Sequence, residues 1–371
     1  MTRPGAVTVV GNGVAGYACA THLAARGAAV TLIGPGLPCD RPPLSKRALH
    51  RGAVPYLTDA AQLAAAGIGH LDGWATELDV HRRSLVVRDR RSGIGRRVEF
   101  ERLVWATGLR IARPPLPGIE LADQNVDGAS VAAVLPRLAA AGRHVVVVGA
   151  GLIGCETAAT LARRHRVTLV EQAAQPLARQ HAPVRAAAER VLTGLGVRVL
   201  GGCAITRIDL AGAGRVVRTA GHGDLAADVV LVAAGVEATL PRALGGGRTV
   251  DTDECLAVPG AEGIWACGDV AAFPHPRFGR IAIPHWDNAR AAGAHAAAAA
   301  LGATAPYVRD PYWFSDIGPL RIQQVGFAPA ACEWSHRDGL HIGRGSDGHP
   351  ACIVLLDSPQ RLNDARRLLA A

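Results

Sequence analysis

Val7-Thr-Val-Val-Gly-Asn-Gly-Val-Ala-Gly16 lies near the start of the chain, and Val145-Val-Val-Val-Gly-Ala-Gly-Leu-Ile-Gly154 repeats its pattern farther along. Each stretch is an apolar run with a G-x-G-x-x-G turn, followed by an alanine-rich segment and a second apolar run, at 29–33 and 167–171. This order predicts a buried strand, a glycine turn, a helix and a second buried strand. Right-handed crossovers of this kind build a parallel sheet with its ligand site at the carboxyl ends of the strands. Because the two runs begin 138 residues apart, they predict two complete nucleotide-binding domains.

The three glycines of each turn have separate roles. The first permits the tight turn, the second lets the backbone approach a pyrophosphate, and the third lets the helix pack on the strand. The pyrophosphate then lies against the helix N-terminus, where free N–H groups and the helix dipole favour an anion. A glycine turn without a nucleotide is the alternative, and the flanking strand and helix argue against it at both places.

The two turns differ in the acid that is expected at the end of the second strand. The second strand of the later unit ends at Glu171, seventeen residues past Gly154. An acid there accepts hydrogen bonds from the ribose 2′-hydroxyl and repels a 2′-phosphate, which predicts NADH rather than NADPH. The earlier unit has Gly34-Pro35-Gly36 at this place, so a nucleotide bound there has lost a ribose contact or receives it from another residue.

Length and composition suggest an ordinary intracellular protein of more than one domain. A chain of 371 residues is too long for a single hydrophobic core, and 49% of its residues are hydrophobic. No apolar run approaches the length of a membrane span, and the N-terminus lacks a signal-peptide pattern, so we expect a cytoplasmic protein without membrane attachment. The eight cysteines form no C-x-x-C or C-x-x-x-x-C, so the sequence shows neither a zinc ribbon nor a redox dithiol and predicts no metal site.

The formal net charge of +9 comes from 40 basic residues, of which only Lys46 is a lysine. The densest basic run, 82–97, alternates with apolar residues around Ser-Gly-Ile-Gly, as an exposed hairpin does. This pattern does not favour nucleic-acid binding. The charge suits an acidic protein partner better.

Several later segments mark the domain organisation. Pro114-Pro-Leu-Pro-Gly118 predicts a stiff connector between the first and second domains. A buried strand at 229–235, a helix at about 288–301, and a C-terminal region of short strands ending in a helix at 361–370 follow along the chain. The composition does not indicate an oligomeric state.

At Asp40-Arg-Pro-Pro-Leu-Ser-Lys46 the sequence resembles the ferredoxin-reductase-like flavoproteins, which include reductase components of aromatic-ring dioxygenases and the putidaredoxin and rubredoxin reductases. Ala106-Thr-Gly108 with Arg110 resembles the flavin-contacting turn of that family, and 267–271 resembles its second flavin motif. The stretches 285–289 and 311–316 resemble its late aromatic motifs. The likeness extends over essentially the whole chain in the same order.

The resemblance implies an α/β fold with two Rossmann-like dinucleotide-binding domains, as in glutathione reductase, and a small α+β C-terminal domain. The FAD-binding domain would be discontinuous, at 1–113 and 236–305. The NAD-binding domain would cover 114–235, and a C-terminal interface domain 306–371.

The same resemblance implies the roles of individual residues. The FAD pyrophosphate would lie on the first glycine turn, NADH on the second, and Asp269 would bind the ribityl chain. Lys46 would lie beside the isoalloxazine and Glu156 by the nicotinamide, and these two are the candidate catalytic residues. The candidate cofactor-binding residues are Gly11, Gly13, Ala15, Gly16, Arg41, Lys46, Ala106, Thr107, Gly108, Arg110, Gly149, Gly151, Leu152, Ile153, Gly154, Glu156, Glu171, Gly235, Gly268, Asp269, His285, Trp286 and Trp313.

Each of these roles competes with a structural one. Glu156 is also explained as a first-turn acid stabilised by the helix dipole, and Asp269 as an ordinary turn residue. Trp286 and Trp313 are equally suited to core packing. Lys46 has an argument of its own, because the only lysine of the chain lies where the family has one and a compact ammonium differs from a guanidinium. A positive charge there would stabilise negative charge that develops on the flavin.

Together these features predict an NADH-dependent flavoprotein reductase that passes electrons through FAD to an acidic [2Fe-2S] ferredoxin. Two departures from the family are the missing acid at Pro35–Gly36, which leaves open how tightly FAD is held, and a segment at 235–239 without the usual Pro-Asn pair. The C-terminal region is also shorter than the resemblance leads us to expect, and because that region helps to shape the surface where a protein partner docks, the acceptor stays open. One alternative is direct reduction of a small molecule, a quinone or oxygen. The other is a redox-sensing interaction protein like apoptosis-inducing factor.

Overall fold

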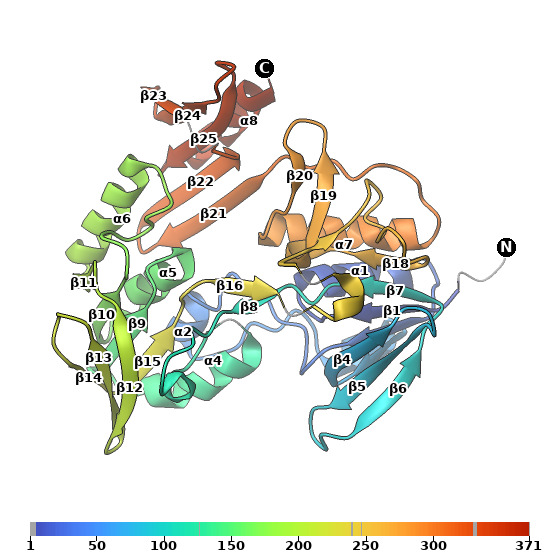
Figure 1. The fold of residues 1–371 in the computed structure, drawn as a ribbon, viewed down its shortest axis with the longest axis horizontal. Helices are drawn as coiled ribbons and strands as arrows, with labels where there is room; N and C mark the ends of the chain where they lie inside the picture. The colour runs from blue at the N-terminus through green and yellow to red at the C-terminus, as the bar shows by residue number, and fades with distance from the viewer. Residues whose placement is uncertain (1–4, 126, 239, 246, 329–331, 371) are drawn as a thin grey trace. The chain divides into compact units, whose positions relative to one another are not determined.

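The computed structural model describes residues 5–125, 127–238, 240–245, 247–328 and 332–370, and the chain forms two compact units (Figure 1). The first unit contains 1–41, 55–110 and 237–310, and the second contains 42–54, 111–236 and 311–371. The short segment 42–54, with Lys46, therefore belongs to the second unit. Three separate domains, as the sequence suggests, remain a prediction, because the structure divides the chain into two units.

The first unit is built on a parallel sheet with strand order β18-β7-β1-β2-β3. The crossover from β1 to β2 runs through α1, and Val7 pairs with Val30 in parallel register. An antiparallel meander, β4-β5-β6, follows β3 and contains the hairpin that the arginine-rich run predicts. The elements of this unit are β1 (Val7–Val10), α1 (Val14–Ala24), β2 (Val30–Ile33), α3 (Ala60–Ala65), β3 (Ile68–Leu71), β4 (Gly73–Asp79), β5 (Ser84–Asp89), β6 (Gly95–Glu99), β7 (Arg102–Trp105), η3 (Arg242–Leu244), β17 (Val250–Asp251), β18 (Ile264–Ala266), η4 (Gly268–Val270), β19 (Ala271–His275), β20 (Gly279–Ile281) and α7 (Trp286–Ala300).

The second unit repeats this arrangement with a parallel sheet of order β11-β10-β9-β15. An antiparallel sheet, β21-β22-β25-β24-β23, and the helix α8 follow in its C-terminal part. The elements of this unit are α2 (Arg47–Arg51), η1 (Ile119–Leu121), α4 (Gly128–Val134), η2 (Leu135–Leu138), β9 (His144–Val148), α5 (Leu152–Leu161), β10 (Arg166–Val170), α6 (Ala182–Gly194), β11 (Arg198–Leu200), β12 (Ile205–Ala211), β13 (Gly214–Thr219), β14 (Leu225–Ala227), β15 (Val229–Val232), β21 (Tyr312–Ile317), β22 (Leu320–Gly326), β23 (Glu333–Arg337), β24 (Leu340–Arg344), β25 (Pro350–Leu356), η5 (Pro359–Arg361) and α8 (Leu362–Ala370). The strands β8 (Leu109–Ile111) and β16 (Val236–Ala238) each span a place where the chain passes from one unit to the other.

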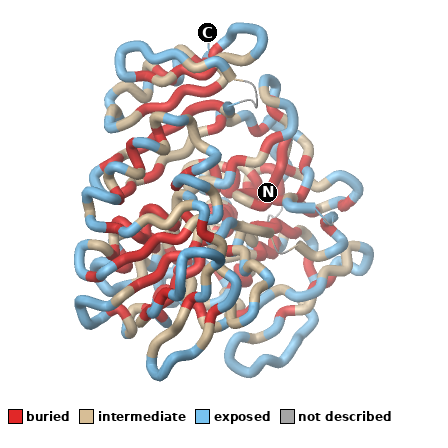
Figure 2. The backbone as a smooth tube through the Cα atoms, turned by 60° about the vertical axis from the view of Figure 1, so that its left-hand side comes forward, coloured by how far each residue is buried: buried red, intermediate tan, exposed pale blue. Residues whose placement is uncertain are grey.

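The strands that precede the two glycine turns are buried. All four residues of β1 are buried, and so are the four valines 145–148 of β9. Strands buried on both faces are typical of parallel sheets that helices cover. Figure 2 shows long buried stretches of the backbone in red and exposed loops in pale blue. The predicted α/β fold with two Rossmann-like units is confirmed.

Candidate functional site

The first glycine turn joins β1 to α1 and has the geometry that its sequence predicts. Gly11 has a φ of +108°, and a Cβ there would lie 2.2 Å from the carbonyl oxygen of Ala106. A Cβ at Gly16 would lie 1.7 Å from the Gly11 carbonyl oxygen. A Cβ at Gly13 would meet nothing within 4 Å, since this residue caps α1 beside open space. The helix start therefore presents its backbone N–H groups to that space.

The second turn, between β9 and α5, reproduces this geometry in the second unit. Gly149 has a φ of +97°, and a Cβ at Gly154 would lie 1.9 Å from the Gly149 carbonyl oxygen. Gly151 caps α5 and is again open, with nothing within 4 Å of its Cβ position. Leu152 and Ile153 form the first turn of the helix. Each unit thus has a glycine turn that leads into a helix N-terminus suited to an anion.

Glu171 lies directly after β10 and is held against the second turn. Its Oε2 accepts a hydrogen bond of 2.7 Å from the Ala150 N–H, and its Oε1 accepts one of 2.9 Å from the Ala173 N–H. The half-buried carboxylate therefore lies beside the residue between the first two glycines of the turn. This is the position from which an acid can bind the ribose of a nucleotide on the turn.

In the first unit, the 3-10 helix η4 and the middle of α7 pack against α1. A Cβ at Gly268 would lie 2.7 Å from the Ala15 Cβ, and one at Gly293 would lie 2.1 Å from the Ala15 carbonyl oxygen. Glycine at these two positions lets the elements approach the second residue of α1. Asp269 follows Gly268 in the chain and therefore lies near the N-terminus of α1.

Three polar atoms of the first unit test whether a large cofactor fits there. Thr107 Oγ1, Asp269 Oδ1 and Trp286 Nε1 are buried, and none has a hydrogen-bond partner among the described residues. Buried polar atoms are nearly always paired, so atoms without partners indicate a site for a ligand with its own donors and acceptors. Burial raises the pKa of Asp269, and Arg41 opposes this shift. These three residues and the open Gly13 fit a dinucleotide cofactor such as FAD.

The remaining candidates of the first unit have structural partners. Arg41 donates from Nη1 to the Leu109 carbonyl oxygen at 2.8 Å, beside Gly108, whose φ is +65°. Arg110 pairs with Glu237 at 2.9 Å, and both side chains are exposed. His285 caps α7 by accepting from the Asp287 N–H.

Lys46 and Glu156, 110 positions apart in the sequence, form an ion pair in the second unit. The distance from Lys46 Nζ to Glu156 Oε1 is 3.0 Å, and Asp316 Oδ2 lies 3.6 Å from the same ammonium. The Lys46 side chain is 21% exposed and that of Glu156 8%, so the pair is largely shielded from water. The ammonium also lies 5.5 Å from the centre of the Phe314 ring. The structure thus brings together the two residues that the sequence singles out as catalytic candidates.

Two serines, which the sequence analysis did not select, complete this network. Ser45 Oγ donates to Glu156 Oε2, and Ser315 Oγ donates to Glu156 Oε1 at 2.6 Å. The Asp316 N–H also donates to Glu156 Oε1, at 3.3 Å. Ser45 adjoins Lys46, and Ser315 and Asp316 end the aromatic motif at 311–316, so position within the motifs is the signal that could have found them. Glu156 is the fifth residue of α5 and lies past its first turn, so the explanation as a first-turn acid stabilised by the helix dipole is wrong, and these contacts hold the carboxylate instead.

Trp313 and Gly235 complete the candidates of the second unit. Trp313 lies in β21 opposite Gln324, whereas the ring beside Lys46 is that of Phe314. Gly235 has a φ of +101°, and its carbonyl oxygen accepts from the Ala112 N–H at 3.0 Å.

The cysteines show no relay for electrons. All eight are free thiols, and most are buried. Burial raises the pKa of Cys155, beside Glu156, and raises that of Cys267 to about 12. Such thiols stay protonated at neutral pH and are poor nucleophiles.

The helices described in the structure include none with the length and apolar character needed to span a bilayer.

Comparison with known proteins agrees with this geometry. The sequence matches the family described as "Pyridine nucleotide-disulphide oxidoreductase" over residues 5–293. It is 32% identical to the ferredoxin reductase component of chlorobenzene dioxygenase from Cupriavidus sp. (strain PS12), across 98% of this chain and 92% of that protein. It is 30% identical to rhodocoxin reductase from Rhodococcus erythropolis, across 92% of this chain and 81% of that protein.

Solved structures share the fold. The ferredoxin reductase for the CYP199A2 system from Rhodopseudomonas palustris is 26% identical, with a TM-score of 0.83 over 95% of this chain and 91% of that one. Putidaredoxin reductase, in a covalent complex with putidaredoxin, superposes with a TM-score of 0.87 over 100% of this chain and 93% of that one, at 23% identity. The chain therefore belongs to the pyridine nucleotide-disulphide oxidoreductase family.

Proposed function

We propose that the chain is an NADH-dependent FAD flavoprotein reductase that delivers electrons to an acidic [2Fe-2S] ferredoxin. The observation that carries this proposal is a pair of glycine turns of matching geometry, of which only the second has a carboxylate at the end of its second strand. Two such turns suit two dinucleotides, and relatives across nearly the whole length have names that include ferredoxin reductase.

FAD is assigned to the first unit. The N-terminus of α1 would hold the pyrophosphate, and Gly13 leaves the space for it. Thr107, Asp269 and Trp286 contribute the polar atoms that lack partners within the described residues. Asp269 suits the hydroxyls of the ribityl chain, since an ionised carboxylate is a strong acceptor.

NADH is assigned to the second unit. The N-terminus of α5 would hold its pyrophosphate, with Gly151 as the open position. Glu171 would accept from the ribose hydroxyls, and its charge disfavours the 2′-phosphate of NADPH. We therefore expect NADH to bind at least about tenfold more tightly than NADPH, the size of effect that one charged contact has on affinity.

Lys46 and Glu156 would prepare the site for charge transfer. FAD, when bound, accepts electrons in pairs and releases them singly. The Lys46 ammonium is held by Glu156 and Asp316, so it is positioned without reorganisation. Beside the flavin, as the family resemblance implies, it would stabilise negative charge there. Glu156 acts mainly by orienting the ammonium, with Ser45 and Ser315 fixing its carboxylate.

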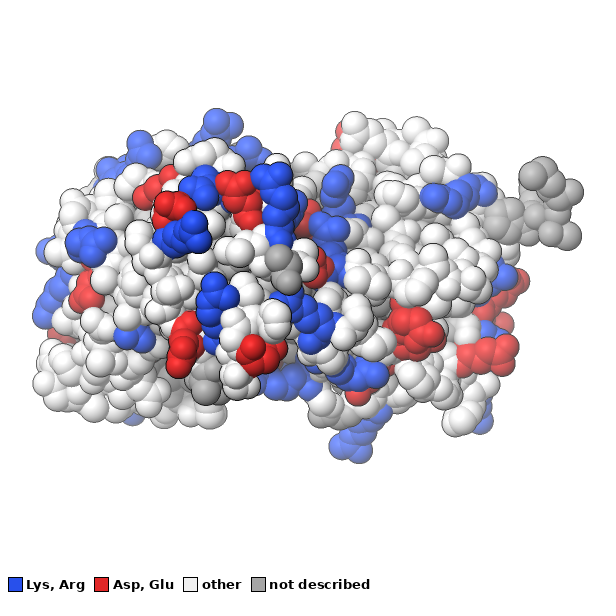
Figure 3. Space-filling view, turned by 90° about the horizontal axis from the view of Figure 1, so that it is seen from above, with Lys and Arg blue, Asp and Glu red and all other residues white. Residues whose placement is uncertain are grey.

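The ferredoxin is the class of partner that the charge favours. The chain has a formal charge of +9. On the face in Figure 3, blue basic side chains are interspersed with red acidic ones rather than gathered in one uniform patch. Long-range attraction of an acidic protein thus rests on the net charge, which raises association rates more than affinity.

The visible spectrum of the purified protein, followed by titration with NADH, tests this proposal. We expect a yellow protein whose flavin is bleached by NADH and reoxidised rapidly only when a [2Fe-2S] ferredoxin is present. Equal turnover without the ferredoxin would instead favour a quinone, another small molecule or oxygen as the acceptor. A long-lived reduced complex that no acceptor reoxidises would favour a redox-sensing role, and a colourless protein that never takes up FAD would refute the proposal.

A further inference from the structure

The turn after β2, where the first unit lacks its acid, is held firmly against the first glycine turn. Asn12 Nδ2 donates to the carbonyl oxygens of Pro35, at 3.1 Å, and Gly36, at 2.7 Å. His70 Nε2 lies 3.0 Å from the Gly34 carbonyl oxygen. A Cβ at Gly34 would lie 2.4 Å from Asn12 Cγ, so only glycine lets the two turns pack this closely.

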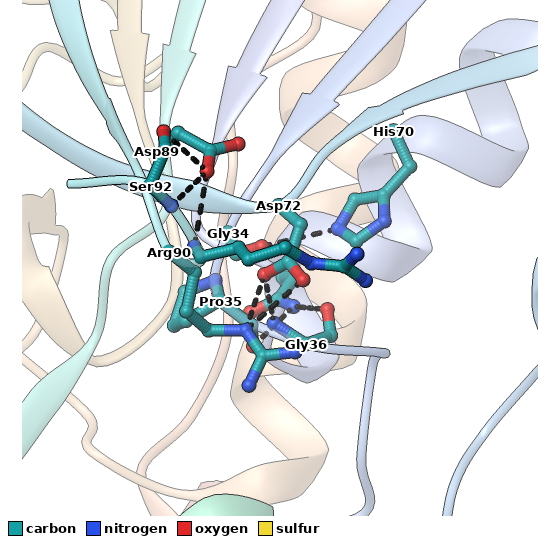
Figure 4. Close-up of polar contacts among 10 residues, drawn as sticks. Gly34, Pro35, Gly36, His70, Asp72, Asp89, Arg90 and Ser92 are labelled. Carbon is teal, nitrogen blue, oxygen red and sulfur yellow. Dashed lines mark hydrogen bonds and ion pairs between the residues drawn. The ribbon is translucent and has the colours of Figure 1, made fainter. Parts of the chain in front are cut away.

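The carboxylate of Asp72, at the end of the neighbouring strand, contacts this turn. Asp72 follows β3, which lies next to β2 in the sheet, and its Oδ1 accepts from the Gly36 N–H at 2.7 Å (Figure 4). The carboxyl ends of parallel strands share one edge, and that edge is where nucleotides bind. Asp72 therefore brings an acid to the expected edge, one strand farther out.

Arg90, directly after β5, donates hydrogen bonds to both carboxylate oxygens of Asp72. Its Nε donates to Asp72 Oδ1 at 2.7 Å and to Oδ2 at 3.0 Å, and its backbone N–H donates to the Asp72 carbonyl oxygen at 3.0 Å (Figure 4). The hydrogen bond from Arg90 is the main cause that lowers the pKa of Asp72, so the carboxylate is charged at neutral pH. No hydrogen bond within the described ranges engages the two terminal amino groups of Arg90, whose side chain is 47% exposed.

We propose that Arg90, oriented by Asp72, replaces the missing acid and binds the adenosine ribose of FAD as a hydrogen-bond donor. This inference rests on the proposed function, in which FAD lies on the first glycine turn. Ribose hydroxyls accept hydrogen bonds as well as donate them, and a guanidinium held through Nε keeps donors for them. The polarity of the contact is thereby reversed relative to Glu171 in the second unit.

A donor at this place changes which nucleotides the site tolerates. A carboxylate repels a 2′-phosphate, whereas a guanidinium attracts it. The first site therefore accepts an adenosine ribose with either a free or a phosphorylated 2′-hydroxyl, although the second site rejects the phosphorylated form.

Competition against FAD on the apoprotein tests this reversal. FAD binding is followed by quenching of flavin fluorescence, and 5′-ADP and 2′,5′-ADP are compared as competitors. Only displacement of FAD is recorded, so ADP that binds at the second turn does not contribute. We expect 2′,5′-ADP to compete at least as well as 5′-ADP in the wild-type protein.

Two substitutions should shift this preference in opposite directions. Arg90→Gln frees the Asp72 charge, so 2′,5′-ADP becomes about tenfold weaker than 5′-ADP and FAD affinity falls about tenfold, as for the loss of one charge-assisted hydrogen bond. Asp72→Asn keeps an oxygen for the Gly36 N–H but releases Arg90 from its counter-ion, so 2′,5′-ADP becomes the stronger competitor. Arg91→Gln, next along the chain and exposed, changes the net charge equally and should change neither value.

The outcomes separate this inference from the proposed function. The role of Arg90 is overturned if 2′,5′-ADP fails to compete in the wild-type protein, or if the Arg90→Gln and Arg91→Gln variants have the same competitor preference and FAD affinity. FAD binding itself would still stand in either case. A protein that never binds FAD overturns both. Circular dichroism and NADH affinity, which should match the wild type in all three variants, exclude a folding defect as the cause.

Discussion

At the scale of single residues, Glu156 shows how a buried charge is tolerated in this protein. Its carboxylate is shielded from water but has the Lys46 ammonium, two serine hydroxyls and a backbone N–H as partners. A buried charge is costly unless it is paired and hydrogen-bonded, and every one of these contacts lies within the second unit. The network thus contributes to stability as well as to the proposed chemistry.

Glu156→Gln should weaken this network without leaving a cavity. The amide keeps the shape of the side chain but loses the charge-assisted contacts, so we expect the free energy of unfolding to fall by about 1–3 kcal/mol. Denaturant unfolding of the apoprotein measures the change. Glu120→Gln, at an exposed position of the same unit, is the matched control and should be neutral. Equal stability of the two variants would show that the network adds nothing to the fold.

Asp269 is expected to favour FAD binding at the expense of stability. Burial raises its pKa in the folded protein above the unfolded value, so its ionised form is disfavoured by the fold. The contribution of this group to stability is therefore greatest at low pH and is lost as the pH rises through the folded pKa. Removing the charge should relieve that penalty only where the carboxyl is ionised.

Asp269→Asn should therefore make the apoprotein more stable at about pH 7.5, and the gain should shrink toward pH 4, near the unfolded pKa of about 3.9. The same variant should bind FAD about tenfold more weakly, because a neutral amide is the poorer acceptor. Thermal unfolding across this pH range and flavin fluorescence measure the two effects. A gain in stability that does not depend on pH would contradict the role given to burial.

At the scale of elements, the two glycine turns separate positions needed for folding from positions needed for the ligand. In the second unit, a methyl group at Gly154 would collide with the Gly149 carbonyl oxygen, whereas one at Gly151 would enter open space. Gly154→Ala should destabilise the protein by at least about 1–3 kcal/mol, the cost of overpacking. Gly151→Ala should leave the melting temperature unchanged and weaken NADH binding. Calorimetry with NADH titration of both variants tests this, and a normal NADH affinity for Gly151→Ala would argue against a nucleotide on this turn.

Much of this element structure could be predicted from the sequence because its signals are local. The glycine turns, the helix expected at 288–301 and the hairpin in the arginine-rich run depend on short-range patterns, and the structure places α7 at Trp286–Ala300 and a hairpin between β5 and β6. The helix α7 begins at Trp286, two residues before the predicted start at 288. The sequence does not mark this start, because the capping residue His285 is not one of the usual Ser, Thr, Asp or Asn.

The rest depends on contacts between distant parts of the chain. The segment 42–54 packs α2 against α5 in the second unit, and the hydrogen bond from Ser45 to Glu156 joins residues 111 positions apart. No periodic pattern in one segment specifies a partner so far along the chain. The roles of Asp72 and Arg90 cannot be predicted from the sequence for the same reason. The sequence shows that the acid after β2 is missing, but it does not show the strand order that places Asp72 beside Gly36.

At the scale of the whole molecule, the excess of positive charge gives a prediction about kinetics. Attraction between exposed charges is screened over about 10 Å at 0.1 M salt and about 3 Å at 1 M. If the partner is an acidic ferredoxin, raising the salt concentration from about 0.01 M to 0.5 M should lower the second-order rate of ferredoxin reduction at least about tenfold, since steering raises association rates by 10–1000-fold. The much slower reduction of a neutral quinone by the same preparation is the control, and its rate should be almost unchanged by salt, because no attraction between net charges is involved. A ferredoxin rate that does not depend on salt would mean that docking relies on short-range contacts, and the charge of +9 would then have no part in partner selection.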